Sequence, residues 1–424
     1  MLPNPQVMES VEKLRYQVTV ADVAAQTGLN LEVANREVML LASLTSGDLA
    51  VAESGDITYK FSPNFRGVLL QRSAAARTRA FWQAVWKWVF YLIRISFGII
   101  LVVSIMVVVV AIVVAIAAIN SQNQRDERSD DRRSGGNNWF VYVGNPFNLF
   151  YPSYGSRYPT NTQERLRSPE KAEGDRGFLE NVFSFLFGDG DPNANAEERR
   201  YRLIAQVIRN HDGVVIAEQI APYLDEVDSA ATDNENFMLP VLVKFNGFPE
   251  VSQHGTFAYR FPDLQTTATS RQKATMPECF TEAPWQFSKS GSGAIALSAG
   301  LGIFYLVAAL YLGVLLQSPV IQQNLIGFLG LVNGAFGFLL GYAILFLTIP
   351  SVRYFVIQVA NQKILDRNIQ RQQRADLLQQ SLPQLASKLA FARQFAIAQK
   401  TLDTERISYS TEQDVLEQEF GRDA

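Results

Sequence analysis

The chain has 424 residues, of which 48% are hydrophobic and 19% are charged, and its net charge at pH 7 is −3. This balance gives no general attraction to nucleic acid. The single cysteine, Cys279, excludes an intramolecular disulfide and a CxxC metal or cluster site. Only two histidines, His211 and His254, are available for metal ligation or catalysis. Residues 1–15 are polar and contain acids, which is unlike a signal or transit peptide.

The first predicted domain covers residues 1–73. An N-terminal helix is followed by a short helix that opens with the capping-box pair Thr19 and Asp22. A third helix is predicted over residues 31–44, and residues 49–61 have the pattern of a β-hairpin. Helix, helix, helix and hairpin in this order predict a winged-helix-like domain.

Two long stretches of the sequence, residues 95–124 and 290–352, contain no Asp, Glu, Lys or Arg. A bilayer-spanning helix needs about 20 apolar residues, so we expect an integral membrane protein in contact with lipid. The first transmembrane helix, with a Trp-rich interfacial beginning, is predicted at residues 81–119. Two more form a hairpin over residues 294–349, which Pro350 is expected to end. The fold class is therefore α+β combined with membrane all-α, with about three transmembrane helices.

Small residues recur every three or four positions on both helices of the predicted hairpin. One set is Gly327, Gly330, Gly334, Gly337 and Gly341, and the other is Ser298, Gly302, Ala309 and Gly313. Small faces allow helix backbones to approach closely in lipid, so we expect these two faces to pack on each other. A partner subunit or a conduction path is the alternative, although a path would normally require charge within the membrane.

A biased linker is predicted over residues 120–195, and a second winged-helix-like domain over residues 196–265. This second domain repeats the first at an offset of 200 residues. The matching pairs are Gly47 and Gly247, Val51 and Val251, Gly55 and Gly255, Tyr59 and Tyr259, and Phe61 and Phe261. The chain then ends in a Gln- and Arg-rich segment, residues 351–424, which predicts an amphipathic helical tail at the membrane surface.

Basic residues flank both ends of the predicted membrane region. Seven lie within residues 60–94 with no acid among them, and five more lie within residues 353–374 beside the single acid Asp366. The positive-inside rule assigns both flanks to the same side. Three crossings cannot satisfy both assignments, so either the first apolar run is a re-entrant hairpin or one basic flank is misleading. Three spans remain our working count.

The third helices of the two predicted domains do not resemble DNA-reading helices. Residues 31–44 include Glu32 and Glu37, and Asp225, Glu226 and Asp228 precede the counterpart. Acids in these places repel phosphate, so nucleic acid is an unlikely partner.

The sequence contains no complete catalytic or metal-binding pattern. Asp189, Asp191 and Asn193 resemble the beginning of a calcium loop, but Ala194 and Arg200 stand where such loops need Gly and Glu. No Walker loop, GxSxG, HExxH or GxGxxG pattern occurs. We therefore expect no catalytic, cofactor or metal site.

Five short stretches resemble an uncharacterised membrane family of cyanobacteria and plant chloroplasts. They are ENVFSFLFGDGDPN (180–193), APYLD (221–225), LPVL (239–242), YRFPDL (259–264) and YSTEQD (409–414). The resemblance implies a cyanobacterial member of this family, in the thylakoid or plasma membrane. Plant members carry the label "iron–sulfur cluster biosynthesis family protein".

The leading hypothesis from the sequence is a non-enzymatic membrane scaffold or assembly factor, which docks partner proteins through two winged-helix-like domains. A membrane-tethered DNA-binding regulator is the second possibility. The others are a transporter component and, from the family label, an iron–sulfur biogenesis factor.

Overall fold

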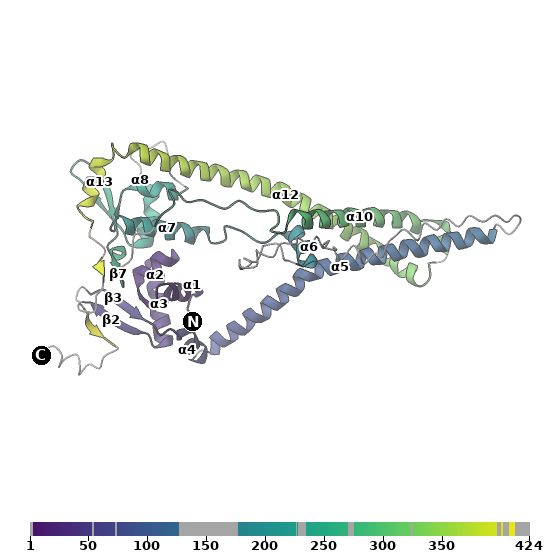
Figure 1. Cartoon of the computed structure of the whole chain (residues 1–424), viewed down its shortest axis with the longest axis horizontal. Coiled ribbons are helices and arrows are strands. Elements are labelled where there is room, and N and C mark those ends of the chain that lie inside the picture. The colour runs from purple at the N-terminus through teal and green to yellow at the C-terminus, as the bar shows by residue number, and fades with distance from the viewer. Residues whose placement is uncertain are drawn as a thin grey trace, which may run out of the picture. The chain divides into compact units, whose positions relative to one another are not determined.

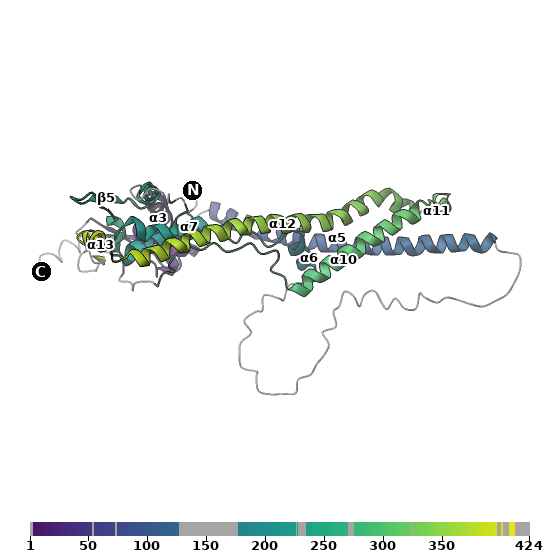
Figure 2. The same ribbon diagram turned by 90° about the horizontal axis from the view of Figure 1, so that it is seen from above.

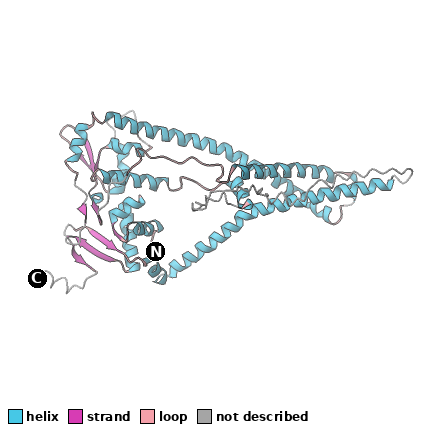
Figure 3. Ribbon diagram, in the orientation of Figure 1, coloured by secondary structure: helices cyan, strands magenta, loops and turns pink. Residues whose placement is uncertain are grey.

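The computed structural model describes residues 3–52, 55–72, 74–126, 177–225, 227, 235–269, 275–323, 325–396, 400–401 and 407–411. The chain forms two compact units. Unit 1 consists of Met1–Phe90, Gly190–Trp285 and Val356–Ala424, and unit 2 consists of Tyr91–Asp189 and Gln286–Phe355. Among the described residues, every strand belongs to unit 1 (Figure 3).

The first repeat lies at the beginning of unit 1 (Figure 1). Its elements are α1 (Pro5–Lys13), β1 (Gln17–Thr19), α2 (Val20–Thr27), α3 (Leu31–Thr45), β2 (Asp48–Ala52) and β3 (Ile57–Lys60), followed by α4 (Phe65–Arg72). The predicted capping box of Thr19 and Asp22 is present. Asn30 caps α3, and Gly28 ends α2 with φ of 77°, a conformation that favours glycine. The short strand β1 was not predicted.

The second repeat has the same order of elements. They are α7 (Ala196–Asn210), β4 (Val214–Val215), α8 (Ala217–Ile220), the 3₁₀ turns η3 (Ala221–Tyr223) and η4 (Asn236–Met238), α9 (Leu239–Phe245), β5 (Phe248–Val251) and β6 (Phe257–Arg260). The 3₁₀ turn η5 (Pro262–Gln265) and strand β7 (Thr266–Thr267) follow. The hairpin register is conserved at the offset of 200, because Leu49 pairs with Tyr59 and Pro249 pairs with Tyr259.

A matched glycine and phenylalanine close each repeat. A Cβ atom on Gly47 would lie 2.9 Å from the Phe61 ring, and one on Gly247 would lie 2.3 Å from the Phe261 ring. Both rings are buried in the cores of their repeats. The turn between the third helix and the hairpin therefore requires glycine, which explains why both residues recur in the sequence.

The C-terminal region departs from the predicted helical tail. Helix α12 (Phe328–Ser381) continues through Pro350, so this proline, which was expected to end the third span, does not end the helix. A proline inside a helix removes one helical hydrogen bond, and Pro350 is buried within the continuous helix. Helix α13 (Ala386–Arg393) follows, and the tail then forms strands β8 (Lys400–Thr401) and β9 (Ile407–Ser410).

Strand β9 adds to the free edge of β2, and its approach is helped by Leu49. The Leu49 N–H donates to Thr411 Oγ1 at 2.8 Å, and the Thr411 N–H donates to the Leu49 carbonyl at 2.9 Å. The equivalent residue in the second repeat is Pro249, which has no N–H to donate. A proline on an edge strand discourages further pairing, so the tail strand fits the first repeat and not the second.

The second repeat and the segment after it bind three basic residues of α12, namely Arg367, Arg371 and Arg374. The prediction had placed this stretch on a membrane surface. Arg371 is fully buried, and its guanidinium donates to Asp225 and Glu282 and stacks 5.0 Å from the centre of the Phe280 ring. Arg367 pairs with the same Glu282. Burial works to raise the pKa of Glu282, but the hydrogen bonds and charges of the two arginines outweigh it and lower the pKa to about 2.

Unit 2 contains helices only, among the residues that the structure describes. They are the later part of α5 (Ala74–Asp126), α6 (Phe178–Phe187), α10 (Ser292–Leu316), α11 (Pro319–Gln323) and the first part of α12. Helices α5, α10 and α12 contain segments long and apolar enough to cross a membrane. Figure 2 shows these segments running side by side, and they share one buried core with α6. Helix α6 falls in the predicted linker, whereas residues 127–176 of that linker lie outside the described residues.

The predicted face-to-face packing of the two small-residue stripes is wrong. The α10 stripe is buried, but a Cβ atom on Gly302 would meet Phe346 at 2.6 Å and one on Gly313 would meet Phe336 at 2.6 Å. A Cβ on Gly334, Gly337 or Gly341 would meet no described atom within 4 Å, and Gly327 lies before the helix with φ of 67°. Gly330 approaches only the carbonyl of Leu325.

The reason is that residues recur every three or four positions on two opposite faces of α12, one of which contains the glycines and the other larger apolar residues. Its buried face contains large and small apolar residues: Leu329, Val332, Phe336, Leu339, Ala343 and Phe346. At 3.6 residues per turn, this face is on the opposite side of the helix from the glycines. Glycines on α10 make room for aromatic rings of α12, which bury more apolar area than a glycine-on-glycine contact.

Candidate docking cleft

The two repeats of unit 1 are joined directly, through α2 of the first and α7 of the second. Ala21 and Ala25 of α2 belong to the buried core of the second repeat. A Cβ atom on Gly28 would lie 2.3 Å from the backbone oxygen of Glu198 on α7. Small residues on α2 therefore allow the two helices to approach closely, and this contact fixes how the repeats face each other.

The carboxylate of Asp22 is fully buried at this joint. It accepts hydrogen bonds from the Thr19 N–H at 3.1 Å, the Thr267 hydroxyl at 2.9 Å and the Ala268 N–H at 2.9 Å. It also forms an ion pair with Arg209 of α7 at 3.0 Å. A buried charge is tolerated when it is paired and its oxygens are satisfied, so Asp22 ties α2 to two elements of the second repeat.

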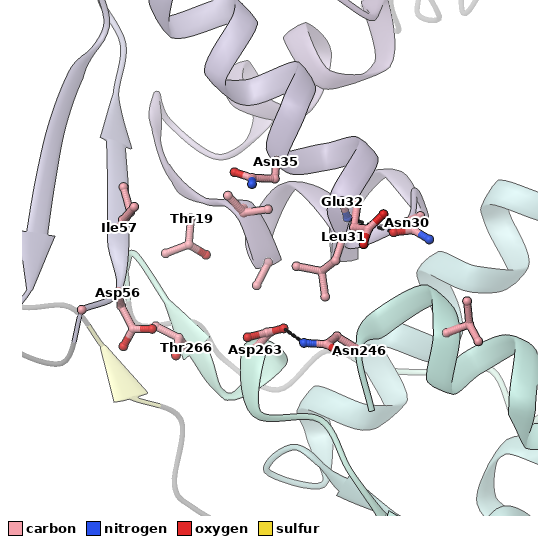
Figure 4. A pocket seen from close by; sticks show the side chains of 14 residues that line it. Thr19, Asn30, Leu31, Glu32, Asn35, Asp56, Ile57, Asn246, Asp263 and Thr266 are labelled. Atoms are coloured by element: carbon pink, nitrogen blue, oxygen red, sulfur yellow. Dashed lines mark hydrogen bonds between the residues drawn. The ribbon is translucent and has the colours of Figure 1, made fainter. Parts of the chain in front are cut away.

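A cleft of about 410 Å³ lies beside the joint. This volume is in the range of typical ligand pockets, roughly 300–1,000 Å³. The first repeat contributes Thr19, Val20, Ala21, Asn30, Leu31, Glu32, Asn35, Gly55, Asp56 and Ile57, and the second contributes Val243, Asn246, Asp263 and Thr266. Figure 4 shows Leu31 and Glu32 at the start of α3, opposite Asp263 and Asn246. The cleft exists only because the repeats meet.

The polar lining of the cleft is acidic. Glu32, Asp56 and Asp263 contribute carboxylates, and none of its fourteen described lining residues is Lys, Arg or His. Asn246 donates to Asp263 at 3.0 Å, which holds that carboxylate at the end of α9 (Figure 4). The cleft therefore has a negative potential that favours cations and repels phosphate.

One side of the cleft is formed by an unusually apolar surface helix. Val243 lines the cleft and is 74% exposed, and Leu239, one turn earlier on the same face of α9, is 55% exposed. The opposite face of α9 is buried through Val241 and Phe245. A helix that is apolar on all sides is normally covered by something, so this exposed face is a candidate contact surface.

A network of charged residues holds the beginning of this helix. Lys388 of α13 donates to Glu218 at 2.8 Å and to Glu235 at 2.7 Å. The Tyr259 hydroxyl donates to the same Glu235 at 2.6 Å. Burial works to lower the pKa of Lys388, but the two carboxylates outweigh it and raise the pKa above its usual value. The C-terminal tail thus positions the segment that leads into α9.

A second cleft, of about 270 Å³, also lies between the repeats. It is formed by α1 and α2 of the first repeat and by α7 and the residue before it. Lys13, Arg199 and Arg202 line it together with Glu9 and Glu198. Its three basic residues exceed its acidic ones by a single charge, and Glu9 and Lys13 already form an ion pair at 2.7 Å, so it offers less for a charged partner than the acidic cleft.

The small residues singled out in the sequence lie in unit 2 and contribute nothing to the cleft.

The candidate metal ligands of the sequence lie in different segments of the chain. His211 ends α7, His254 lies in the hairpin turn, and Cys279 is buried and donates to Gln372 at 3.3 Å. In the part of the chain that the structure describes, no three His, Cys, Asp or Glu side chains are grouped as metal ligands. The start of the suspected calcium loop is used internally, since Asn193 bonds with Ala283.

The cleft residues of the second repeat were not predicted from the sequence. Asp263 lies in the YRFPDL stretch of the family resemblance, but neither it nor Asn246 belongs to a pattern that indicates binding, and only the fold brings them opposite Glu32. One signal was available for Leu239 and Val243, because residues 239–245 (LPVLVKF) are apolar except at Lys244. A short helix that is apolar on both faces indicates an uncovered contact surface.

The chain was compared with known families, proteins and structures. No family model matches it. It is 36% identical over 430 residues to the uncharacterised chloroplastic protein At5g03900 of Arabidopsis thaliana, covering 98% of this chain and 80% of that protein. No solved structure matches.

Proposed function

The chain belongs to the family of this chloroplastic Arabidopsis protein, and we propose that it is a non-enzymatic membrane scaffold that docks partner proteins through two winged-helix-like repeats. The order of helix, strand, helix, helix and hairpin in both repeats supports the winged-helix assignment. The observation that carries the proposal is the cleft that the repeats form together, with the exposed apolar face of α9 beside it.

A docking role is favoured over DNA binding by the chemistry of the third helices. A DNA-reading helix presents basic and amide side chains to the major groove. In this chain α9 presents Leu239 and Val243, and α3 presents Glu32 beside an Arg36 that lies 3.8 Å from Glu37. These groups suit a protein surface and weaken any attraction to phosphate.

The construction of unit 1 also constrains the membrane topology. Three separate stretches of the chain share its cores, and Asp22 and Arg209 come from two of them. Stretches that fold together must lie on the same side of a membrane. Helices α10 and α12 provide an even number of crossings between Trp285 and Val356. A location of both chain ends on one side of the membrane agrees with the basic residues at both flanks.

We propose a photosynthetic membrane as the location, either the thylakoid or the plasma membrane of a cyanobacterium. Three helices of sufficient length and hydropathy support membrane insertion. The Arabidopsis relative is named as a chloroplastic protein. A docking protein in such a membrane can bring soluble factors to membrane-embedded ones, as an assembly factor does.

The proposal is tested by purifying the tagged full-length chain from native membranes in mild detergent, with and without nuclease. We expect a small set of proteins to co-purify in amounts comparable to the tagged chain, and to be unaffected by nuclease. Recovery of the chain alone would contradict a docking function. Recovery that depends on nucleic acid would support the DNA-binding regulator instead.

A further inference from the structure

We propose that the acidic cleft between the repeats binds a segment of a partner protein that presents apolar side chains flanked by lysine or arginine. This inference rests on the proposed docking function and adds the chemistry of the partner. It follows from three features of the cleft: its apolar wall, its carboxylates and its position at the junction of the repeats.

The apolar wall continues from the cleft onto the open surface of α9. Leu31 and Ile57 of the first repeat face Val243 of the second across the cleft, and Leu239 extends the same face by one helical turn. Residue 243 corresponds to Ser43 in the first repeat, whereas Leu239 corresponds to Met39, which is exposed to a similar degree, so Val243 is the apolar residue that distinguishes the second repeat. Covering exposed Val and Leu side chains supplies the nonpolar part of a binding energy.

The carboxylates select the charge of the partner. Glu32 lies at the start of α3 in the first repeat, and Asp263 lies in η5 of the second repeat, where Asn246 at the end of α9 holds it. The two acids therefore come from the two repeats that form the cleft. Lys or Arg side chains of a bound segment can reach them with charge-assisted hydrogen bonds. An anionic membrane surface or a nucleic acid would be repelled by the same groups, which leaves a basic protein segment as the occupant.

The position of the cleft makes it a site that one repeat cannot provide. Its walls come from α3 and the hairpin turn of the first repeat and from the end of α9 and η5 of the second. The ion pair of Asp22 and Arg209 and the close contact at Gly28 hold these walls apart at a fixed distance. A preformed cleft binds a segment without the entropic cost of ordering its own walls.

A photo-crosslinking experiment identifies what lies in the cleft. The full-length chain carries p-benzoylphenylalanine in place of Val243, or in place of Leu365 as a control that is 57% exposed on α12. We expect adducts at position 243 whose peptides contain apolar residues with Lys or Arg, and no such adducts at position 365. Adducts only with lipid, only with a second copy of this chain, or with segments that lack basic residues would overturn the proposal.

Charge-neutral variants test the carboxylates. Glu32→Gln combined with Asp263→Asn should lower recovery of the crosslinked partner by about tenfold, as expected when charge-assisted hydrogen bonds are lost. Asp366→Asn, which removes an exposed acid of α12 outside the cleft, should leave recovery unchanged. Equal recovery with the unsubstituted chain, the double variant and the control variant would overturn the cleft assignment while leaving the docking function intact. Failure of the unsubstituted chain to recover any partner would instead contradict the docking function itself.

Discussion

Asp22 and Arg209 belong to different repeats and form an ion pair at 3.0 Å, in which the Asp22 carboxylate is completely buried. Asp22 also caps α2 and accepts hydrogen bonds from Thr267 and Ala268. One side chain thus completes a local capping motif and a long-range contact between repeats. This pair is the reason to treat unit 1 as a single folded body.

The first prediction concerns this pair. Asp22→Ala leaves the Arg209 guanidinium buried beside an empty site, and breaking a buried pair in this way costs about 3–5 kcal/mol. Thermal unfolding of the full-length chain in detergent should show a clearly lowered midpoint. Glu9→Ala, which removes an exposed ion pair with Lys13, should leave the midpoint unchanged. Equal midpoints for both variants would mean that the repeats are not held together at Asp22.

The second prediction separates the two glycine sets of unit 2. Gly302→Leu should destabilise the helical core by about 1–3 kcal/mol, because its side chain would overlap Phe346. Gly334→Leu should be tolerated, since no described atom lies within 4 Å of its Cβ position. Thermal aggregation in detergent compares the two variants.

Phe346→Ala provides an independent check on the same contact. The Phe346 ring is buried against α10, and its removal should cost about 3–5 kcal/mol. If Gly334→Leu proves the more damaging change and Phe346→Ala is harmless, then the glycines of α12 form the packed face and the arrangement described for unit 2 is incorrect.

Much of the local structure follows from the sequence, because its signals are local. The capping box of Thr19 and Asp22 and the glycine at position 28 correctly predict the ends of α2. The absence of charge in two long segments correctly predicts helices able to span a membrane. The matching residues at an offset of 200 correctly predict strands at residues 57–60 and 257–260.

Contacts between distant segments could not be predicted in this way. The two faces of α12 have the same three- and four-residue spacing, so periodicity alone cannot show that Phe346, and not Gly334, meets α10. Arg371 appeared as one of many basic residues near a membrane span, and only the fold reveals its contacts with Asp225 and Glu282. The cleft itself depends on how the repeats meet, which no single stretch of sequence encodes.

The third prediction is a dependence of stability on acid. The lowered pKa of Glu282 means that its ionised form stabilises the folded state above its usual pKa of 4.5, and that this contribution is lost as the pH falls towards about 2. The unfolding midpoint should therefore fall over this range.

The variant Glu282→Gln isolates this contribution. It should be less stable than the unsubstituted chain at neutral pH, because Arg367 loses its anionic partner and the buried Arg371 keeps only Asp225. Its midpoint should then change less between pH 4.5 and pH 2, whereas Glu197→Gln, at an exposed position, should follow the unsubstituted chain. Parallel pH profiles for all three proteins would show that Glu282 is not held in its charged form by these arginines.

The most direct test of the account is the sidedness of the two chain ends. The docking cleft requires residues 30–57 and residues 243–266 in the same compartment. The full-length chain, tagged at either end, should be labelled by an impermeant reagent in sealed membrane vesicles of known orientation. We predict that both tags are labelled from the same side of the membrane, and that neither tag is labelled from the opposite side. Tags on opposite sides would separate the first repeat from the C-terminal tail, and would contradict both unit 1 and the cleft.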